Sequence, residues 1–308
     1  MTAASSTPDA APEPGPPPSA VPPPSLESPA ALAPTVHRTV IEPPVGWQLV
    51  DVRELWRYRE LLFFLIWRDV KIRYKQAVLG IAWAVLQPAM LMIVFSVFLG
   101  RLGGFTGGDI PYPLFVLTGL LAWTFFSTAV GQAASSVVGS ERLITKIYFP
   151  RLAVPFAAVG AAVFDFAISL GLLGVMMAAY GHAPSWQIVF APVVFGILLI
   201  AAAGLGTLLA ALTVAYRDFR FVTPFLLQVG MYATPTIYML LPPDPSDGLK
   251  LWLTLNPLVA PIASFRVCLL GGPIPWEGLA ISATAAVALF VLGCLYFRKV
   301  EDEFADKI

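Results

Sequence analysis

The most constraining feature of this sequence is the length of its uncharged stretches. Asp, Glu, Lys and Arg are absent from residues 76–100, 110–140, 221–243 and 278–297, and residues 152–216 contain one of them, Asp165. A helix needs about 20 apolar residues to cross the hydrocarbon core of a bilayer. Only 12% of the 308 residues are charged and 57% are hydrophobic, whereas about a quarter of residues are charged in a typical soluble domain. The sequence therefore predicts an all-α integral membrane protein.

The uncharged stretches predict six transmembrane helices. The stretch 152–216 is too long for one crossing, and the turn-like sequence YGHAPSW at residues 180–186 divides it in two. Pro and Gly inside the spans are tolerable because neighbouring helices can satisfy the backbone groups that they free. The expected spans are residues 76–100, 114–130, 153–179, 188–214, 221–243 and 278–297.

The cations indicate how the helices are oriented. With the N-terminus inside, the inner segments hold fifteen Lys and Arg residues, without counting Arg38, and the outer segments hold Arg101, Lys250 and Arg266. Short loops rich in Lys and Arg stay in the cytoplasm. We therefore expect both termini to be cytoplasmic.

The first 46 residues differ in composition from the rest and carry 13 of the 29 prolines. Such a segment has no apolar face to pack, so we expect a disordered or polyproline II cytoplasmic tail. Its PPPSAVPPP sequence suits an SH3-like partner, although a solvated extension is the simpler interpretation. The expected organisation is a tail (1–46), an interfacial helix region (47–76), a six-span domain (77–297) and a cytoplasmic C-terminal tail (298–308).

Residues 52–75 predict an amphipathic helix on the membrane surface. A helix would place one group of residues within one arc: Arg53, Arg57, Glu60, Arg68, Lys71 and Lys75. The apolar residues Trp56, Phe63, Ile66, Trp67 and Val70 fall in a broad arc elsewhere, although Phe64 breaks the pattern. This is typical of an interfacial helix that faces anionic lipid or a soluble partner. A basic flank that only fixes the orientation is the alternative.

A second inner element is expected at residues 135–151, SSVVGSERLITKIYFPR. Ser140 can cap a helix of two to three turns that Pro150 ends. Its aromatic residues suit docking in a groove of another protein, and a surface loop that touches lipid is equally open.

The expected outer segment at residues 242–277 is unusually apolar. It contains two runs of about ten apolar residues separated by Pro257 and Pro261. These suit short re-entrant or interfacial helices, with a plain folded loop as the alternative.

The expected spans contain little that could perform chemistry. Asp165 is an intramembrane carboxylate for which the sequence suggests no nearby partner, so we expect it to face the protein interior. No Gly-Lys pair occurs, so the chain lacks the glycine-rich loop that binds ATP phosphates. Cys268 and Cys294 are too few for a disulfide framework or a metal site. Any energy for work must therefore come from a partner. Aromatic residues that could contact sugar rings or lipid are Phe95, Phe98, Trp123, Phe125, Phe126, Tyr232 and Tyr238.

Several motifs occur in the order found in a known family: RELWRYRELLFFLIWRDVKIRYKQAVLGIAWAVLQP, LITKIYFPRLAVP, YRDFRFVTPFLLQ, TPTIY, LNPL and FADKI. With these motifs the chain, from about residue 47 to 308, resembles the permease subunit of type-2 ABC exporters of lipid-linked polysaccharide. The resemblance implies export of an O-antigen-like, polyprenyl-diphosphate-linked glycan across the bacterial inner membrane. It also implies a homodimer with two copies of a separate ATP-binding subunit, which would hold ATP and Mg. No cofactor is expected in this chain, and no nucleic acid among its partners.

The resemblance further implies roles for individual segments. The helix at residues 52–75 would be a gate helix, and residues 242–275 would be outer gate helices. The diphosphate would be attracted by Arg57, Arg68, Lys71 and Arg73. The coupling helix that seats in the ATPase would include Ser140, Glu141, Arg142, Leu143, Lys146, Tyr148, Phe149 and Arg151. The glycan would pass through a dimer channel lined by the aromatic residues.

Two other functions remain open. An exporter of a drug or small lipid from the same superfamily would share this topology. A membrane glycosyltransferase would need a carboxylate or metal pair, and the C-terminal EDEFAD is the nearest candidate, with a solvated tail as the simpler interpretation.

Overall fold

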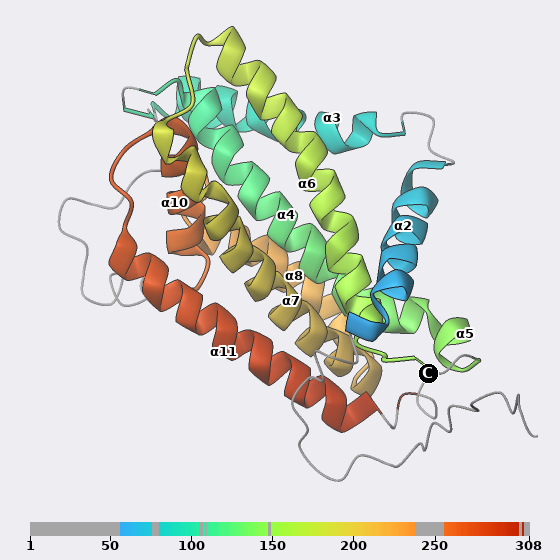
Figure 1. Ribbon diagram of the computed structural model, residues 1–308. Coiled ribbons are helices and arrows are strands. Elements are labelled where there is room, and N and C mark those ends of the chain that lie inside the picture. The colour runs from blue at the N-terminus through green and yellow to red at the C-terminus, as the bar shows by residue number, and fades with distance from the viewer. Residues whose placement is uncertain are drawn as a thin grey trace, which may run out of the picture. The chain divides into compact units, whose positions relative to one another are not determined.

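The computed structural model describes residues 56–75, 80–104, 107–108, 110–146, 149–237, 256–301 and 304, which all belong to the unit Pro44–Ile308. The expected tail (1–46) lies outside the described residues. The described part of the chain is helical, apart from a β-bridge between Gly107 and Ile110. Its elements (Figure 1) are α2 (Arg59–Lys75), α3 (Ala82–Phe95), η1 (Ser96–Leu102), α4 (Tyr112–Gly139), α5 (Glu141–Ile144), α6 (Ala153–Ala179), η2 (Trp186–Phe190), α7 (Ala191–Ala215), α8 (Phe219–Ala233), α10 (Val259–Leu270) and α11 (Trp276–Val300).

The structure confirms the all-helical membrane class. Among the described residues, five segments are long and apolar enough to cross a bilayer: Ala82–Leu102, Tyr112–Gly139, Ala153–Ala179, Trp186–Ala215 and Trp276–Val300. The expected span 221–243 corresponds to α8, which has 15 residues and is shorter than expected. The rest of that expected span, from residue 238, lies outside the described residues.

Helix α4 is the central helix of the described bundle. It packs against α6 on one side and α7 on another, while α11 packs on α7 and α2 packs on α6 (Figure 1). In its most apolar window 78% of α4 is buried, against 11% for Ala82–Leu102. The buried hydroxyl of Thr118 in α4 donates to the carbonyl oxygens of Leu114 and Phe115, 3.1 and 2.9 Å away. Burying this polar group therefore requires no partner from another helix.

Glycines set the close approach of α7 and α11. A Cβ atom on Gly204 would lie 2.5 Å from the backbone nitrogen of Phe290 in α11. A Cβ atom on Gly293 would overlap the carbonyl oxygen of Gly204. Small residues at a helix crossing let two backbones pack closely in a membrane, so this crossing depends on both glycines.

Helix α10 forms a polar junction with the chain that follows α8. Asn256 donates from Nδ2 to the Thr234 hydroxyl, 3.1 Å away. Arg266 donates to the Thr236 carbonyl, 2.6 Å away, and its guanidinium carbon lies 3.7 Å from the centre of the Phe115 ring. Residues 259–270 form one short apolar helix that includes Pro261, whereas the sequence predicted that Pro261 would separate two runs. Most of the first expected apolar run lies outside the described residues.

We expect Tyr112→Phe to weaken this junction modestly. The Tyr112 hydroxyl donates to the Ile237 carbonyl, 2.9 Å away, and losing one such bond costs about 1 kcal/mol. Unfolding by sodium dodecyl sulfate in mixed micelles would measure the loss. Tyr180→Phe is the matched control because Tyr180 is largely exposed. Equal midpoints for the two variants would contradict the prediction.

Candidate functional site

A pocket of about 300 Å³ lies between α2, α3, α4 and α6. Its walls are partly apolar, with Trp83, Pro88 and Phe125, and they include two charged residues, Arg73 and Asp165. The uncharged polar residues of the lining are Tyr74, Gln87, Thr124, Thr128, Gln132 and Ser169. A concave site with a few convergent polar groups in apolar walls is the usual form of a ligand site.

Asp165 is ion-paired, which corrects the expectation that it has no nearby partner. Its Oδ2 contacts Nη1 of Arg73, and its Oδ1 accepts a hydrogen bond from the Tyr74 hydroxyl. The Nη2 of Arg73 donates to Gln132 in α4. The Arg73 and Asp165 side chains are 28% and 19% exposed, so both are largely removed from water.

The packing of α2 on α6 brings these groups together. Leu65 of α2 is 1% exposed, and Ile66 lies so close to Gly160 that a Cβ atom there would be 2.6 Å from its Cδ1. Two turns further along α2, Arg73 reaches Asp165, so the two helices run in the same direction. A side chain at residue 160 would separate the helices, so Gly160 helps to position Arg73.

Burial affects both polar groups at the end of α2. Desolvation lowers the pKa of Arg73, and the nearby Tyr74 and Asp69 act in the opposite direction. Arginine nevertheless stays protonated in proteins. Burial raises the pKa of the Tyr74 phenol, against the opposing effect of Arg73. Tyr74 therefore stays protonated at neutral pH, and its hydroxyl can donate a hydrogen bond to Asp165.

The other predicted diphosphate-binding cations, Arg68 and Lys71 in α2 and Arg57 just before it, lie outside the pocket. Arg57 and Lys71 are exposed, with the Lys71 ammonium 5.7 Å from the Trp67 ring centre. Arg68 pairs with its neighbour Asp69, with Nη2 2.9 Å from Oδ1. The exposed side of α2 mixes cations with Phe63, Phe64, Trp67 and Ile72. Cations and aromatic residues are therefore less separated than the sequence suggested.

The element predicted to couple to an ATPase is shorter than expected. Helix α5 has four residues, and Ser140 precedes it without a side-chain cap hydrogen bond. Phe149, expected to be exposed, is 5% exposed and packs in the core with Ile144. Leu143 and Arg151 are half-buried, and Tyr148 lies outside the described residues. The exposed charged residues of this tip are Glu141, Arg142 and Lys146.

A second hollow adjoins this tip and was not expected from the sequence. Its volume is about 360 Å³, and its lining includes Glu141, Arg217, Arg220 and Phe221. Neither arginine pairs with a carboxylate among the described residues. The only sequence signal was the YRDFR motif, to which no role was given.

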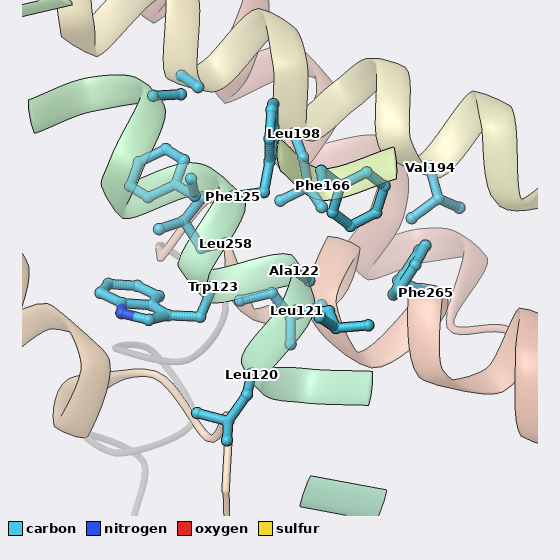
Figure 2. Close-up of a cluster of buried hydrophobic side chains, with 14 of the residues drawn as sticks. Leu120, Leu121, Ala122, Trp123, Phe125, Phe166, Val194, Leu198, Leu258 and Phe265 are labelled. Atoms are coloured by element: carbon cyan, nitrogen blue, oxygen red, sulfur yellow. The ribbon is translucent and has the colours of Figure 1, made fainter. Parts of the chain in front are cut away.

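The predicted channel aromatics fall into two groups. Trp123, Phe125 and Phe126 are buried in the core of the chain, where the Phe125 and Phe166 ring centres are 5.4 Å apart (Figure 2). Phe98 and Tyr232 are exposed, Phe95 is half-buried, and Tyr238 lies outside the described residues. Of the buried group, Phe125 also lines the Arg73–Asp165 pocket.

The part of the chain that the structure describes holds five segments long and apolar enough to cross a membrane, with α4 as the central one, and this defines a multi-pass integral membrane protein. The chain belongs to the ABC-2 type transporter family, whose model matches residues 60–270. This assignment agrees with the resemblance seen in the sequence motifs.

Curated relatives match nearly their whole length. The chain is 35% identical to the O-antigen export system permease protein RfbA of Myxococcus xanthus, over 83% of this chain and 98% of that protein. It is 28% identical to the O-antigen export system permease protein RfbA of Klebsiella pneumoniae, over 80% and 94%. It is 24% identical to the polysialic acid transport protein KpsM of Escherichia coli, over 77% and 92%.

Proposed function

We propose that this chain is the permease subunit of an ATP-driven exporter of polyprenyl-diphosphate-linked, O-antigen-like polysaccharide. The observation that carries the proposal is the 35% identity to an O-antigen export permease over 98% of that relative's length. The exporter would lie in the bacterial inner membrane, with both termini of this chain in the cytoplasm.

The pocket supports a substrate with an anionic headgroup. Arg73 supplies a guanidinium fork, which matches phosphate oxygens in a bidentate fashion. The exposed cations Arg57, just before α2, and Lys71, within α2, would attract the diphosphate to the membrane surface. Apolar and aromatic walls from Trp83 and Phe125 suit the prenyl chain or a sugar ring. The glycan would then pass between two copies of this chain.

The proposed motor is a separate ATP-binding subunit, present in two copies, which would hold ATP and Mg. The α5 tip supports this assignment, because Glu141, Arg142 and Lys146 are exposed together at the end of α4. Charged side chains at the rim of an interface set specificity and association rate.

We expect Arg142→Glu combined with Lys146→Glu to reduce association with the ATP-binding subunit at least about tenfold, since reversed charges meet the wrong sign on the partner. Co-purification of the tagged chain with a co-expressed ATP-binding subunit from the same organism would measure this. Arg101→Glu is the matched control, because Arg101 is an exposed cation at the end of η1. Equal recovery of the partner with the double variant and the control would contradict the coupling role of α5.

Deletion of the gene tests the proposed export function. We expect surface polysaccharide to be lost and lipid-linked glycan to accumulate on the cytoplasmic side. Changed drug sensitivity with an intact surface polysaccharide would favour the drug or small-lipid exporter instead. Loss of glycan synthesis itself would favour the glycosyltransferase.

A further inference from the structure

The position of Asp165 calls for a functional explanation. In the five spanning segments that the structure describes, the carboxylates are Asp165 and Glu277, and Glu277 lies in the first turn of α11. Ionisable residues deep in a membrane usually mark functional sites. Replacing a buried ion pair with apolar residues is often neutral or stabilising. Stability alone therefore does not account for the pair.

The ion pair leaves the pocket without net charge. Among the lining residues that the structure describes, Arg73 and Asp165 are the charged ones, and the others are apolar or uncharged. The fork of Arg73 is already engaged, with Nη1 at Asp165 and Nη2 at Gln132. A phosphate that enters the pocket must therefore compete with the Asp165 carboxylate for the same guanidinium.

The same pair attaches the end of α2 to the bundle. Arg73 and Tyr74, in the last turn of α2, both reach Asp165 of α6. Further back, α2 is held by apolar contacts of Leu65 and by Ile66 against Gly160. Losing the contacts to Asp165 would thus remove the polar attachment of the last turn of α2 to α6, and the Tyr74 ring, 6.1 Å from the Phe164 ring, would remain as its weaker contact with that helix.

We propose that the phosphate group of a polyprenyl-diphosphate lipid replaces Asp165 as the partner of Arg73. This exchange releases the last turn of α2 from α6 and opens the pocket to the substrate. Asp165 is a positioning residue that keeps α2 docked until a phosphate arrives. The inference rests on the proposed function for the identity of the lipid, and an anionic phospholipid headgroup shares the same chemistry.

The test combines a distance and an affinity on the full-length chain in phosphatidylcholine nanodiscs. Spin labels at Ile72→Cys in α2 and Val175→Cys in α6 report docking, because both positions are exposed whereas Cys268 and Cys294 are buried. Geranylgeranyl diphosphate is the probe, compared with geranylgeraniol, inorganic diphosphate and phosphatidylglycerol. In the wild type, we expect the diphosphate lipid to lengthen or broaden the Ile72–Val175 distance distribution.

The variants separate the roles of the two charges. Asp165→Asn should show the released distance without probe and bind the probe about tenfold tighter, within the usual range of coupling between a switch and its ligand. Arg73→Gln should bind the probe at least about tenfold more weakly. Glu60→Gln is the matched control, because it removes an exposed carboxylate from the first turn of the same helix, far along α2 from Arg73, and it should behave as the wild type. If Asp165→Asn fails to fold, the double variant Arg73→Asp with Asp165→Arg replaces it, because it exchanges the two charges and keeps the ion pair. Without probe, the double variant should show the docked distance of the wild type.

Distinct outcomes would overturn the exchange and the proposed substrate. Wild-type affinity and distance in Asp165→Asn would overturn the exchange and leave the export function standing. Equally tight binding of geranylgeraniol would also overturn it, since no phosphate would be needed. If phosphatidylglycerol releases α2 and geranylgeranyl diphosphate does not, the exchange stands and the proposed lipid-linked substrate is wrong.

Discussion

Arg73→Met is expected to destabilise the protein by about 3–5 kcal/mol, because removing one member of a buried ion pair leaves the other charge uncompensated. The Asp165 side chain is 19% exposed, so water replaces its partner poorly. Adding Asp165→Leu to Arg73→Met should recover most of the loss, since an apolar pair of similar size is often as stable as the ion pair. Unfolding by sodium dodecyl sulfate in mixed micelles would give the three free energies.

The free energy of unfolding that the double variant regains relative to Arg73→Met shows whether the ion pair or the packing of Arg73 stabilises the protein. Lys75→Met serves as the control, because Lys75 is an exposed cation of the same helix, and exposed substitutions usually change stability by less than about 0.5 kcal/mol. If the double variant is as unstable as Arg73→Met alone, Arg73 stabilises the protein by packing, and the ion pair is not the reason.

Gly204→Ala is expected to destabilise the protein by about 3 kcal/mol, the upper end of the usual range for overpacking. The new methyl group would lie 2.5 and 2.6 Å from the backbone nitrogen and Cα of Phe290. These two atoms belong to the backbone of α11 and cannot rotate out of the way as a flexible side chain can. Helices α7 and α11 must therefore move apart to make room for the methyl group. The same titration would measure the shift.

Gly196→Ala provides a control of identical chemistry on the same helix. A Cβ atom at Gly196 meets nothing within 4 Å, and Ala is favoured over Gly in a helix interior by about 1 kcal/mol. The same substitution should therefore act in opposite directions at two positions of α7. If both variants gain or both lose stability, the α7–α11 crossing is not as close as described.

The sequence predicted the helices well because the signal for a span is local. Long absence of charge identified five spanning segments, and the motifs indicated the family. The end of α8 was predicted too late because bonds from distant elements decide it. Tyr112 donates a hydrogen bond to the Ile237 carbonyl, and Arg266 donates one to the Thr236 carbonyl. The sequence of residues 221–243 alone gives no indication of these partners.

The site was harder to predict because its parts are far apart in the chain. Tyr74 and Asp165 are separated by 91 positions, and their meeting depends on which helix packs against α6. An intramembrane carboxylate and a basic helix were both visible in the sequence, so pairing them was possible in principle. The burial of Trp123 and Phe126 was not, because lipid and protein interior select the same apolar residues.

The contacts of α4 and α2 also bear on the order in which the chain assembles during synthesis. Helix α4 is made before α6, α7 and α10, which cover it, and it has the lowest mean hydropathy of the five spanning segments. Helix α4 can remain in lipid until those helices are made, because the hydroxyl of its buried residue Thr118 donates hydrogen bonds to the backbone of α4 itself. Arg73 is made earlier still, but Asp165 arrives only with α6. Helix α2 can therefore dock only after α6 has inserted. It is synthesised before α4 and α6 but packs into the bundle after them.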